Sequence, residues 1–278
     1  KKMNIKLPVS VIMPAYNAQR FVRRAVLSIA NQTEHPLEVI IVDDGSKDDT
    51  WDMVLEASKE FSFLQIQGIR LPFNSGPGAA RNAGWDRAKG KYVAFLDADD
   101  VWHPDKLKLQ YSWMVEKHNL VITGHRCDVI AEQDVEPVNT DDMACKIRSF
   151  SFRDFLISNR LSTPSVMVKT SLSMRFPDNL RYCEDYYLWL EIVSLHGEVG
   201  WIDLPLAHLF KAKYGASGLS SELYQMERGE LIALKNIYKA QRITLLTWAV
   251  SVLWSILKFL NRLVLCWFIG DNKRFKRS

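Results

Sequence analysis

The sequence predicts an α/β fold: a Rossmann-like, mostly parallel sheet flanked by helices and followed by a helical C-terminal extension. Apolar runs of strand length alternate with segments whose apolar residues recur at helical spacing, and polar turns follow most of the runs. With 278 residues, 47% of them hydrophobic, the chain can fill a sizeable core. We expect one main domain over residues 1–220, with halves at 1–118 and 119–220, and C-terminal helices over 221–278.

The first half shows the clearest alternation. Its expected strands are apolar runs closed by polar residues, at positions 9–13, 37–42, 63–70 and 92–96. Its expected helices have one apolar face, and they lie at 18–30, at 48–59 and between a glycine-rich loop and Lys89. Because crossovers between parallel strands are right-handed, the polar turns after these strands are expected along one edge of the sheet.

The second half is less regular. Its expected elements are short and separated by polar stretches: strands at 120–123 and 166–169, a short helix at 152–158 and a helix at 186–195. Two further apolar segments, 199–202 and 206–210, are expected to pair as edge strands.

Composition narrows the class of partner. The formal net charge is +4 and no long basic run lies within the folded part, so we expect no nucleic acid partner. The cysteines have neither CxxC nor zinc-finger spacing, so they suggest neither a disulfide framework nor a structural zinc site and favour a reducing, cytosolic setting; they are Cys127, Cys145, Cys183 and Cys266. No apolar signal region follows Lys1 and Lys2, so we expect no export.

The C-terminal part combines two helical patterns. Residues 222–242 have the mixed charge of an exposed helix, and residues 243–269 are strongly apolar. A narrow polar stripe recurs at intervals of three or four residues in the apolar segment: Thr244, Thr247, Ser251, Ser255, Lys258 and Arg262. The uninterrupted apolar part, 245–257, is shorter than the roughly 20 residues of a membrane span.

Tryptophans and a basic tail accompany this apolar helix: Trp248, Trp254, Trp267, Lys273, Arg274, Lys276 and Arg277. Together with the stripe they favour a helix lying in the membrane interface, so we expect residues 243–278 to bind a membrane surface as a peripheral or monotopic element. A helix packed on the main domain or on another subunit is the alternative, and a membrane span stays open.

Four polar features are expected at one edge of the sheet. The strand at 92–96 is followed directly by Asp97, Asp99 and Asp100, which suit a metal but also suit an acidic helix cap before Pro104.

The other three polar features are a turn at 14–17, the acidic turn at 43–46 and a small-residue loop at 74–84. A carboxylate in the turn at 43–46 can accept a nucleobase hydrogen, although the sequence leaves open whether Asp43 or Asp44 does so. The loop brings Arg81 as a diphosphate or ribose contact.

Taken together, these motifs resemble the family 2 glycosyltransferases with the GT-A fold, of the inverting kind that builds bacterial cell-surface polysaccharides. The resemblance covers roughly residues 7–220. It rests on PAYN at 14–17, VDDGS at 42–46, GPGAARNAG at 76–84, FLDADD at 95–100 followed by WHPDKL at 102–107, and CEDYYLWL at 183–190.

The resemblance implies a metal-dependent site for a nucleotide sugar. Asp99 would be the chief metal ligand, Asp97 would contact the metal or ribose, and the oxygen ligands would select Mn²⁺ or Mg²⁺. The turn residues Pro14, Tyr16 and Asn17 would join Arg81 and Asp43 or Asp44 in binding the donor, expected to be a UDP-sugar.

The motif at 183–190 resembles the family's acceptor-side acidic motif. Asp185 would be the general base that takes the proton of an acceptor hydroxyl, with inversion as the outcome. Glu184 and Trp189 would contact the acceptor, although both acids also suit a helix N-terminus and Trp189 equally suits a core.

The segment at 206–220 also resembles the family, in which a His or a basic residue reaches the leaving diphosphate. His208 is a candidate metal ligand, with a structural role as its alternative, and Lys211 and Lys213 are candidate diphosphate contacts. A basic, glycine-bearing loop here could close over a bound donor.

The expected reaction is transfer of a sugar to a hydroxyl of a lipid-linked or surface-polysaccharide precursor, at the cytoplasmic face of a membrane. One rival is a sugar nucleotidyltransferase, which would need a basic glycine-rich loop after the first strand where Pro14 to Asn17 stand. The other is a catalytically inactive GT-A-like scaffold or binding protein, which would not need both Asp99 and Asp185.

Overall fold

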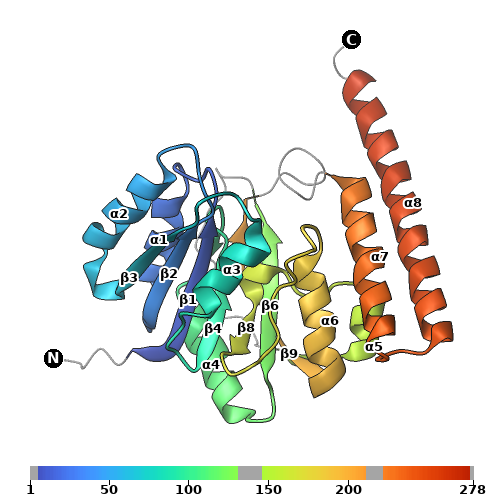
Figure 1. Cartoon of the computed structure of the whole chain (residues 1–278), viewed down its shortest axis with the longest axis horizontal. Coiled ribbons are helices and arrows are strands. Elements are labelled where there is room, and N and C mark those ends of the chain that lie inside the picture. The colour runs from blue at the N-terminus through green and yellow to red at the C-terminus, as the bar shows by residue number, and fades with distance from the viewer. Residues whose placement is uncertain (1–5, 131–145, 211–221, 276–278) are drawn as a thin grey trace.

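The computed structural model describes residues 6–130, 146–210 and 222–275 (Figure 1). The first half alternates strands and helices in the order β1 (Leu7–Ala15), α1 (Val22–Ala30), β2 (Pro36–Asp43), α2 (Thr50–Glu60), β3 (Ile66–Arg70), α3 (Pro77–Trp85) and β4 (Tyr92–Phe95), with a short 3-10 helix at Ser62–Leu64. These four strands lie in the order β3-β2-β1-β4 and all pair in parallel. The predicted alternation of parallel strands and helices is therefore confirmed, except that the strand expected at 63–70 begins at Ile66, after the 3-10 helix.

The second half extends the same sheet. Its elements are β5 (Val101–Trp102), α4 (Lys106–Glu116), β6 (Ile122–Val129), β7 (Ile147–Ser151), α5 (Phe152–Ile157), a 3-10 helix at Thr163–Ser165, β8 (Met167–Lys169), α6 (Glu184–His196) and β9 (Glu198–Leu209). The sheet continues from β4 as β8-β6-β9-β5, and β7 pairs with β9. Here β8, β5 and β7 run antiparallel to their neighbours, so the parallel pairing is concentrated in the first half.

Two cores lie on the two faces of the sheet, because successive side chains of a strand point to opposite sides. Ile12 of β1 belongs to the core that α3 and α6 cover, whereas Val11 and Met13 belong to the core under α1, α2 and α4. This arrangement explains why the central strands read as continuous apolar runs and not as alternating patterns.

The expected pair of edge strands at 199–202 and 206–210 is wrong, because both segments belong to the single strand β9. Pro205 interrupts the apolar pattern but not the strand. It faces Arg126 of β6, where the register of that pair shifts on both sides. A bulge tolerates proline because the ladder hydrogen bond is already missing there.

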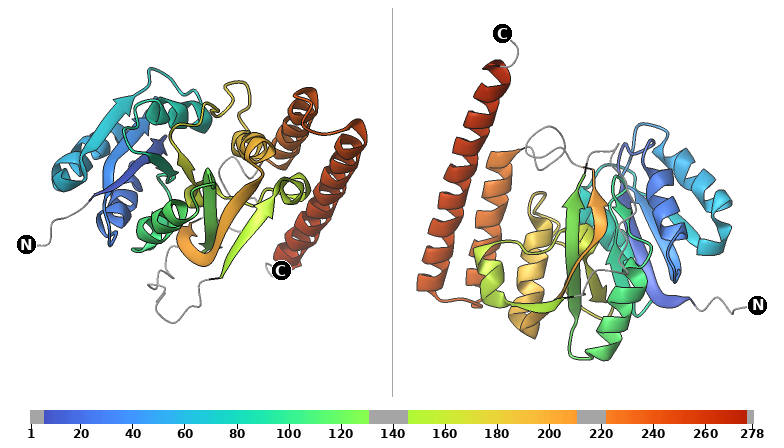
Figure 2. Two further views of the ribbon diagram at one scale, coloured as in Figure 1. Left: turned by 90° about the horizontal axis from the view of Figure 1, so that it is seen from below. Right: turned by 180° about the vertical axis from the view of Figure 1, so that it is seen from behind.

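Two long helices complete the described chain: α7 (Leu223–Lys239) and α8 (Leu245–Phe275). They stand side by side at the end of the molecule farthest from α1 and α2 (Figures 1 and 2). The helix α7 packs on α6, and its residues Ala233, Leu234 and Ile237 join the core on that face of the sheet.

Three residues of the polar stripe, Ser255, Lys258 and Arg262, contact α7, whereas Thr244, just before α8, is exposed. Ser255 donates to Glu227 at 2.9 Å, Lys258 pairs with Glu230 at 2.7 Å and Arg262 pairs with Glu227 at 3.1 Å. On the opposite side, every exposed residue between positions 249 and 265 except Asn261 is apolar. By length and composition, Leu245–Cys266 could also cross a membrane, with a mean hydropathy of 1.6 over its most apolar window.

Candidate active site

A cavity of about 760 Å³ opens where β1, β2 and β4 end and α6 begins. Nine of the residues that the sequence predicts for the site line it: Pro14, Tyr16, Asn17, Asp44, Arg81, Asp97, Asp99, Glu184 and Asp185. They come from segments as far apart as 14–17 and 183–190, so the fold brings together the motifs on which the resemblance rests.

Three carboxylates gather at the end of β4. Asp97, Asp99 and Asp100 each offer an oxygen, and these oxygens all lie within 4.8 Å of one another. Asp97 and Asp99 are half-buried and line the cavity, whereas Asp100 is fully buried and its backbone N–H donates to the Asp97 carbonyl at 3.0 Å. Hard oxygen donors at this spacing fit Mg²⁺ or Mn²⁺.

Arg81 connects this cluster to the start of α6. Its guanidinium lies 2.7 Å from Asp97 and 3.0 Å from Glu184, and the residue is only 5% exposed. Burial by itself would lower the pKa of Arg81, but the neighbouring carboxylates, Asp97 first, raise it above its ordinary value. The side chain predicted to contact a diphosphate or ribose is thus engaged with two carboxylates of the protein.

The first turn of α6 presents Glu184 and Asp185 to the cavity. Cys183, which precedes them, has a left-handed backbone with φ of 58°, a conformation that costs a non-glycine residue about 1–3 kcal/mol and that recurs at functional sites. Asp185 accepts hydrogen bonds from the Thr163 hydroxyl at 3.1 Å and from the Tyr186 N–H at 2.7 Å.

Burial changes the protonation of both acids. It raises the pKa of Glu184 to about 7, helped by the charge of Asp185 and opposed by Arg81. Burial also raises the pKa of Asp185, while Arg81 and the bonds from Tyr186 and Thr163 oppose the shift. A carboxylate whose pKa lies closer to neutrality is a better proton acceptor at physiological pH.

Of the two acids at the end of β2, only Asp44 lines the cavity. It accepts the backbone N–H groups of Ser75 at 2.8 Å and Gly76 at 2.9 Å, which fixes the loop before α3. Asp43 is fully buried, accepts the Ser46 N–H at 2.9 Å and pairs with Arg70 at 3.2 Å. The geometry therefore favours Asp44 as the acid that can reach a ligand.

The turns after β1 and β2 are bonded to each other. Asn17 has a φ of 47°, its N–H donates to the Ser46 hydroxyl at 3.0 Å, and its side-chain oxygen accepts the Lys47 N–H at 3.0 Å. Gly45, with φ of 67°, allows the close passage of the chain at Phe73, because a Cβ there would lie 2.6 Å from the Phe73 carbonyl carbon.

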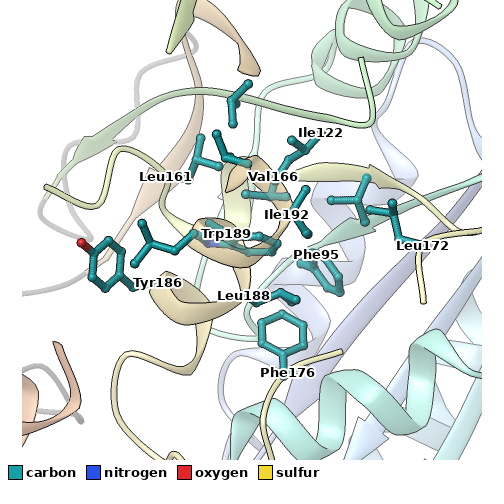
Figure 3. Close-up of a cluster of buried hydrophobic side chains, with 14 of the residues drawn as sticks. Phe95, Ile122, Leu161, Val166, Leu172, Phe176, Tyr186, Leu188, Trp189 and Ile192 are labelled. Atoms are coloured by element: carbon teal, nitrogen blue, oxygen red, sulfur yellow. The ribbon is translucent and has the colours of Figure 1, made fainter. Parts of the chain in front are cut away.

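The prediction that Trp189 contacts the acceptor is wrong. Its indole is 0% exposed and packs against Phe95 and Phe176, with ring centroids 6.2 and 5.7 Å away (Figure 3). A ring enclosed in this way cannot stack on a sugar that enters from solvent. Its helical spacing from Tyr186 and Ile192 marks the buried face of α6.

His208 lies on β9, where its backbone is paired with Val101, and its side chain is buried. Burial lowers its pKa, with the charge of Asp128 opposing the shift. Among the described residues, His208 is neither in the carboxylate cluster nor in the cavity lining. Lys211 and Lys213 lie outside the described residues.

Several cavity residues were not predicted from the sequence. Asn74 begins the small-residue loop at 74–84 but was not itself predicted, and the others come from segments without a recognisable motif: Asn159, Thr163, Arg181, Tyr182 and Met226. Arg181 is an exposed cation that donates to Asn74 at 3.2 Å. Burial raises the pKa of Asp44, and the charge of Arg181 is one of the influences that oppose this rise. The position of Arg181 two residues before the acidic motif was the one available signal.

An open α/β sheet with clustered carboxylates at the end of β4 and an acidic helix start across one cavity defines a protein of the GT-A class. Residues 10–175 match the model of Glycosyl transferase family 2, and the chain belongs to that family.

Named relatives agree with this assignment. The putative teichuronic acid biosynthesis glycosyltransferase TuaG of Bacillus subtilis is 34% identical over 69% of this chain and 74% of its own length. The UDP-Glc:alpha-D-GlcNAc-diphosphoundecaprenol beta-1,3-glucosyltransferase WfgD of Escherichia coli is 30% identical over 67% of this chain and 70% of its own length. An uncharacterized glycosyltransferase of Rickettsia felis is 33% identical over 72% of this chain, but the match spans only 32% of that longer protein.

Solved structures show the same fold. S. aureus TarS 1-349 in complex with UDP-GlcNAc superposes with a TM-score of 0.68 at 21% identity, covering 93% of this chain and 72% of the TarS chain. The mannosyltransferase PcManGT of Pyrobaculum calidifontis, in complex with GDP-Man and Mn2+, superposes with a TM-score of 0.66 at 15% identity, covering 99% of this chain and 81% of its own.

Proposed function

We propose that the chain is an inverting glycosyltransferase that moves a sugar from a UDP-sugar to a hydroxyl of a lipid-linked or surface-polysaccharide precursor. The observation that carries the proposal is that Asp97 and Asp99 line the same cavity as Asp185. The name of WfgD, which acts on a diphosphoundecaprenol acceptor, and the TarS complexes with UDP and UDP-GlcNAc support the substrate classes.

The donor would occupy the side of the cavity formed by the strand ends. Asp44 would accept a hydrogen from the base, and the turn with Pro14, Tyr16 and Asn17 would enclose the nucleoside. Asp99, with Asp97 and Asp100, would hold Mn²⁺ or Mg²⁺. When bound, such a cation supplies positive charge that stabilises the departing nucleoside diphosphate.

The acceptor would approach the start of α6. Its hydroxyl oxygen forms a bond to the anomeric carbon while the bond from that carbon to the diphosphate breaks, and Asp185 takes the hydroxyl proton. Thr163 and the Tyr186 N–H hold the Asp185 carboxylate in place. Attack from the side opposite the leaving diphosphate inverts the anomeric centre.

Residues 221–278 would hold this domain, residues 1–220, at the cytoplasmic face of a membrane. The exposed side of α8 is apolar, while α7 occupies its polar side as far as Arg262. A spanning orientation would carry α7 and its charged residues into the hydrocarbon, so α8 is expected to lie along the membrane surface.

A thermal-shift panel of UDP-, GDP-, dTDP- and CMP-sugars, with and without Mn²⁺, tests the donor assignment. We expect a rise in Tm with UDP-sugars that requires the metal, because a ligand that binds only the folded state stabilises it. Release of UDP only when an acceptor is present would distinguish transfer from an inactive binding protein. A nucleoside triphosphate is added to the panel as a further ligand. A rise in Tm with the triphosphate and not with the sugar nucleotides would favour the nucleotidyltransferase rival.

A further inference from the structure

A second cavity, of about 580 Å³, lies at the turn between α7 and α8, away from the candidate active site. Its walls combine cations with apolar groups and hydroxyls: Phe152, Arg153, Leu156, Tyr238, Lys239, Gln241, Arg242, Ile243, Thr244, Leu245 and Thr247. The two cavities lie toward opposite ends of α7, since Met226 lines the first and Tyr238 the second, about 18 Å apart along the helix.

The cavity is electropositive. Arg153, Lys239 and Arg242 line it, the described lining holds no carboxylate, and none of the three cations makes an ion pair with another described residue. A nearby acid is Glu191 of α6. Burial raises the pKa of Glu191, and the charge of Arg242 opposes this rise. The C-terminal end of α7 accounts for a cation at Lys239 but not for Arg153, which comes from α5.

The backbone adds to this charge. The helix α8 begins at Leu245 beside the cavity, so the N–H groups of its first turn lie at the positive end of the helix dipole. Thr244 caps one of them, accepting the Thr247 N–H at 3.2 Å. Three cations and a helix start together suit a phosphate group.

The apolar part of the lining indicates that this phosphate carries a hydrocarbon tail. Phe152, Leu156 and Ile243 line the cavity, and Leu245 continues from it onto the exposed apolar side of α8. Leu245 and Leu246 are 60% and 75% exposed, which is costly in water but favourable against acyl chains. A free phosphate would leave these contacts unused.

We propose that the cavity at the α7–α8 turn binds the phosphate headgroup of an anionic membrane phospholipid. The inference rests on the membrane association proposed above and adds a specific lipid contact at one end of α8. In the sequence, the basic residues Lys273, Arg274, Lys276 and Arg277 follow the apolar segment, and a basic stretch of this kind favours an anionic surface.

Vesicle flotation of the full chain tests the proposal. Wild-type protein and the triple variant Arg153→Ala, Lys239→Ala, Arg242→Ala are compared on phosphatidylcholine vesicles with and without phosphatidylglycerol. The matched control removes three exposed lysines, one from α2, one from α4 and one directly after α4: Lys59→Ala, Lys108→Ala, Lys117→Ala. Both variants lose the same charge, and every altered cation is exposed, so folding should be preserved.

We expect the control to bind phosphatidylglycerol vesicles like the wild type, and the cavity variant to bind them about tenfold to a hundredfold more weakly, since each cation at an anionic surface contributes about fivefold. Equal binding by the two variants, or no preference of the wild type for phosphatidylglycerol, would overturn the proposal. The assay contains no sugar nucleotide, so its result is independent of whether the chain turns over a donor.

Discussion

The guanidinium of Arg81 lies 2.7 Å from the carboxylate of Asp97, and it is this buried pair that joins the acids at the end of β4 to the start of α6. The other arm of Arg81 reaches Glu184. One side chain therefore links Asp97 of the carboxylate cluster to Glu184, the neighbour of the proposed general base Asp185, and a change at Arg81 is expected to disturb both ends of the cavity.

Arg81→Met should destabilise the fold by about 3–5 kcal/mol, because removal of one partner leaves buried carboxylates without compensation. Urea unfolding followed by circular dichroism measures the change. The matched control is Arg23→Met, since Arg23 pairs with Glu60 on the exposed surface and solvent screens that pair. A loss for Arg81→Met no larger than for Arg23→Met would show that the buried contacts contribute little.

Gly45→Ala should destabilise the protein and weaken UDP binding together. A left-handed backbone alone costs alanine about 1–2 kcal/mol, and its Cβ would also lie 2.6 Å from the backbone of Phe73. Gly197→Ala is the control, because Gly197 also has positive φ but nothing lies within 4 Å of its added Cβ. Equal effects of the two substitutions would mean that the backbone at Phe73 moves away from the added Cβ with no loss of stability.

Glu184 should make stability depend on pH. Its pKa rises from 4.5 to about 7 in the folded protein, so the folded state binds more protons than the unfolded state between these values. Its contribution is fully present below pH 4.5 and is lost as the pH rises through about 7. The free energy of unfolding of Glu184→Gln minus that of the wild type should therefore increase across this window. A difference that stays constant with pH would contradict the assigned shift.

The exposed side of α8 should determine membrane binding without supporting the fold. Leu253→Gln with Leu257→Gln changes two leucines that are 59% and 50% exposed, so Tm should be retained while vesicle binding falls several-fold. Leu55→Gln with Leu195→Gln alters two exposed leucines on α2 and α6 as the control. If both pairs reduce flotation equally, the effect comes from general surface hydrophobicity.

The sequence was sufficient to predict most of the first half of the sheet, because the motifs at 14–17, 43–46 and 97–100 come at the ends of the mostly buried strands β1, β2 and β4. Asp97, Asp99 and Asp44 lie in the cavity for this reason. The loop at 74–84 instead follows β3, which has no buried residue. Which of Asp43 and Asp44 reaches the cavity depends on the loop at Ser75 and Gly76, whose N–H groups bind Asp44. That choice requires the three-dimensional structure.

Long-range packing accounts for what sequence patterns missed. The sequence pattern of Trp189 is equally consistent with stacking on a sugar and with a core position. Only the packing of Phe95 and Phe176 around it decides for the core. Arg81 reads as a phosphate contact because its carboxylate partner Glu184 comes 103 residues later. The polar stripe in residues 244–262 favoured a helix in the membrane interface, and the partners of Lys258 and Arg262 were not visible in that pattern because Glu227 and Glu230 lie on another helix.

The most direct test of the proposed reaction separates donor binding from proton transfer. UDP binding with Mn²⁺ and the rate of sugar transfer are measured for the wild type, Asp99→Asn and Asp185→Asn. We expect Asp99→Asn to lose the metal-dependent part of UDP binding, and Asp185→Asn to keep it while transfer falls by about 10²–10⁴-fold. Transfer at the wild-type rate by Asp185→Asn, or unchanged metal-dependent binding by Asp99→Asn, would contradict the assigned roles.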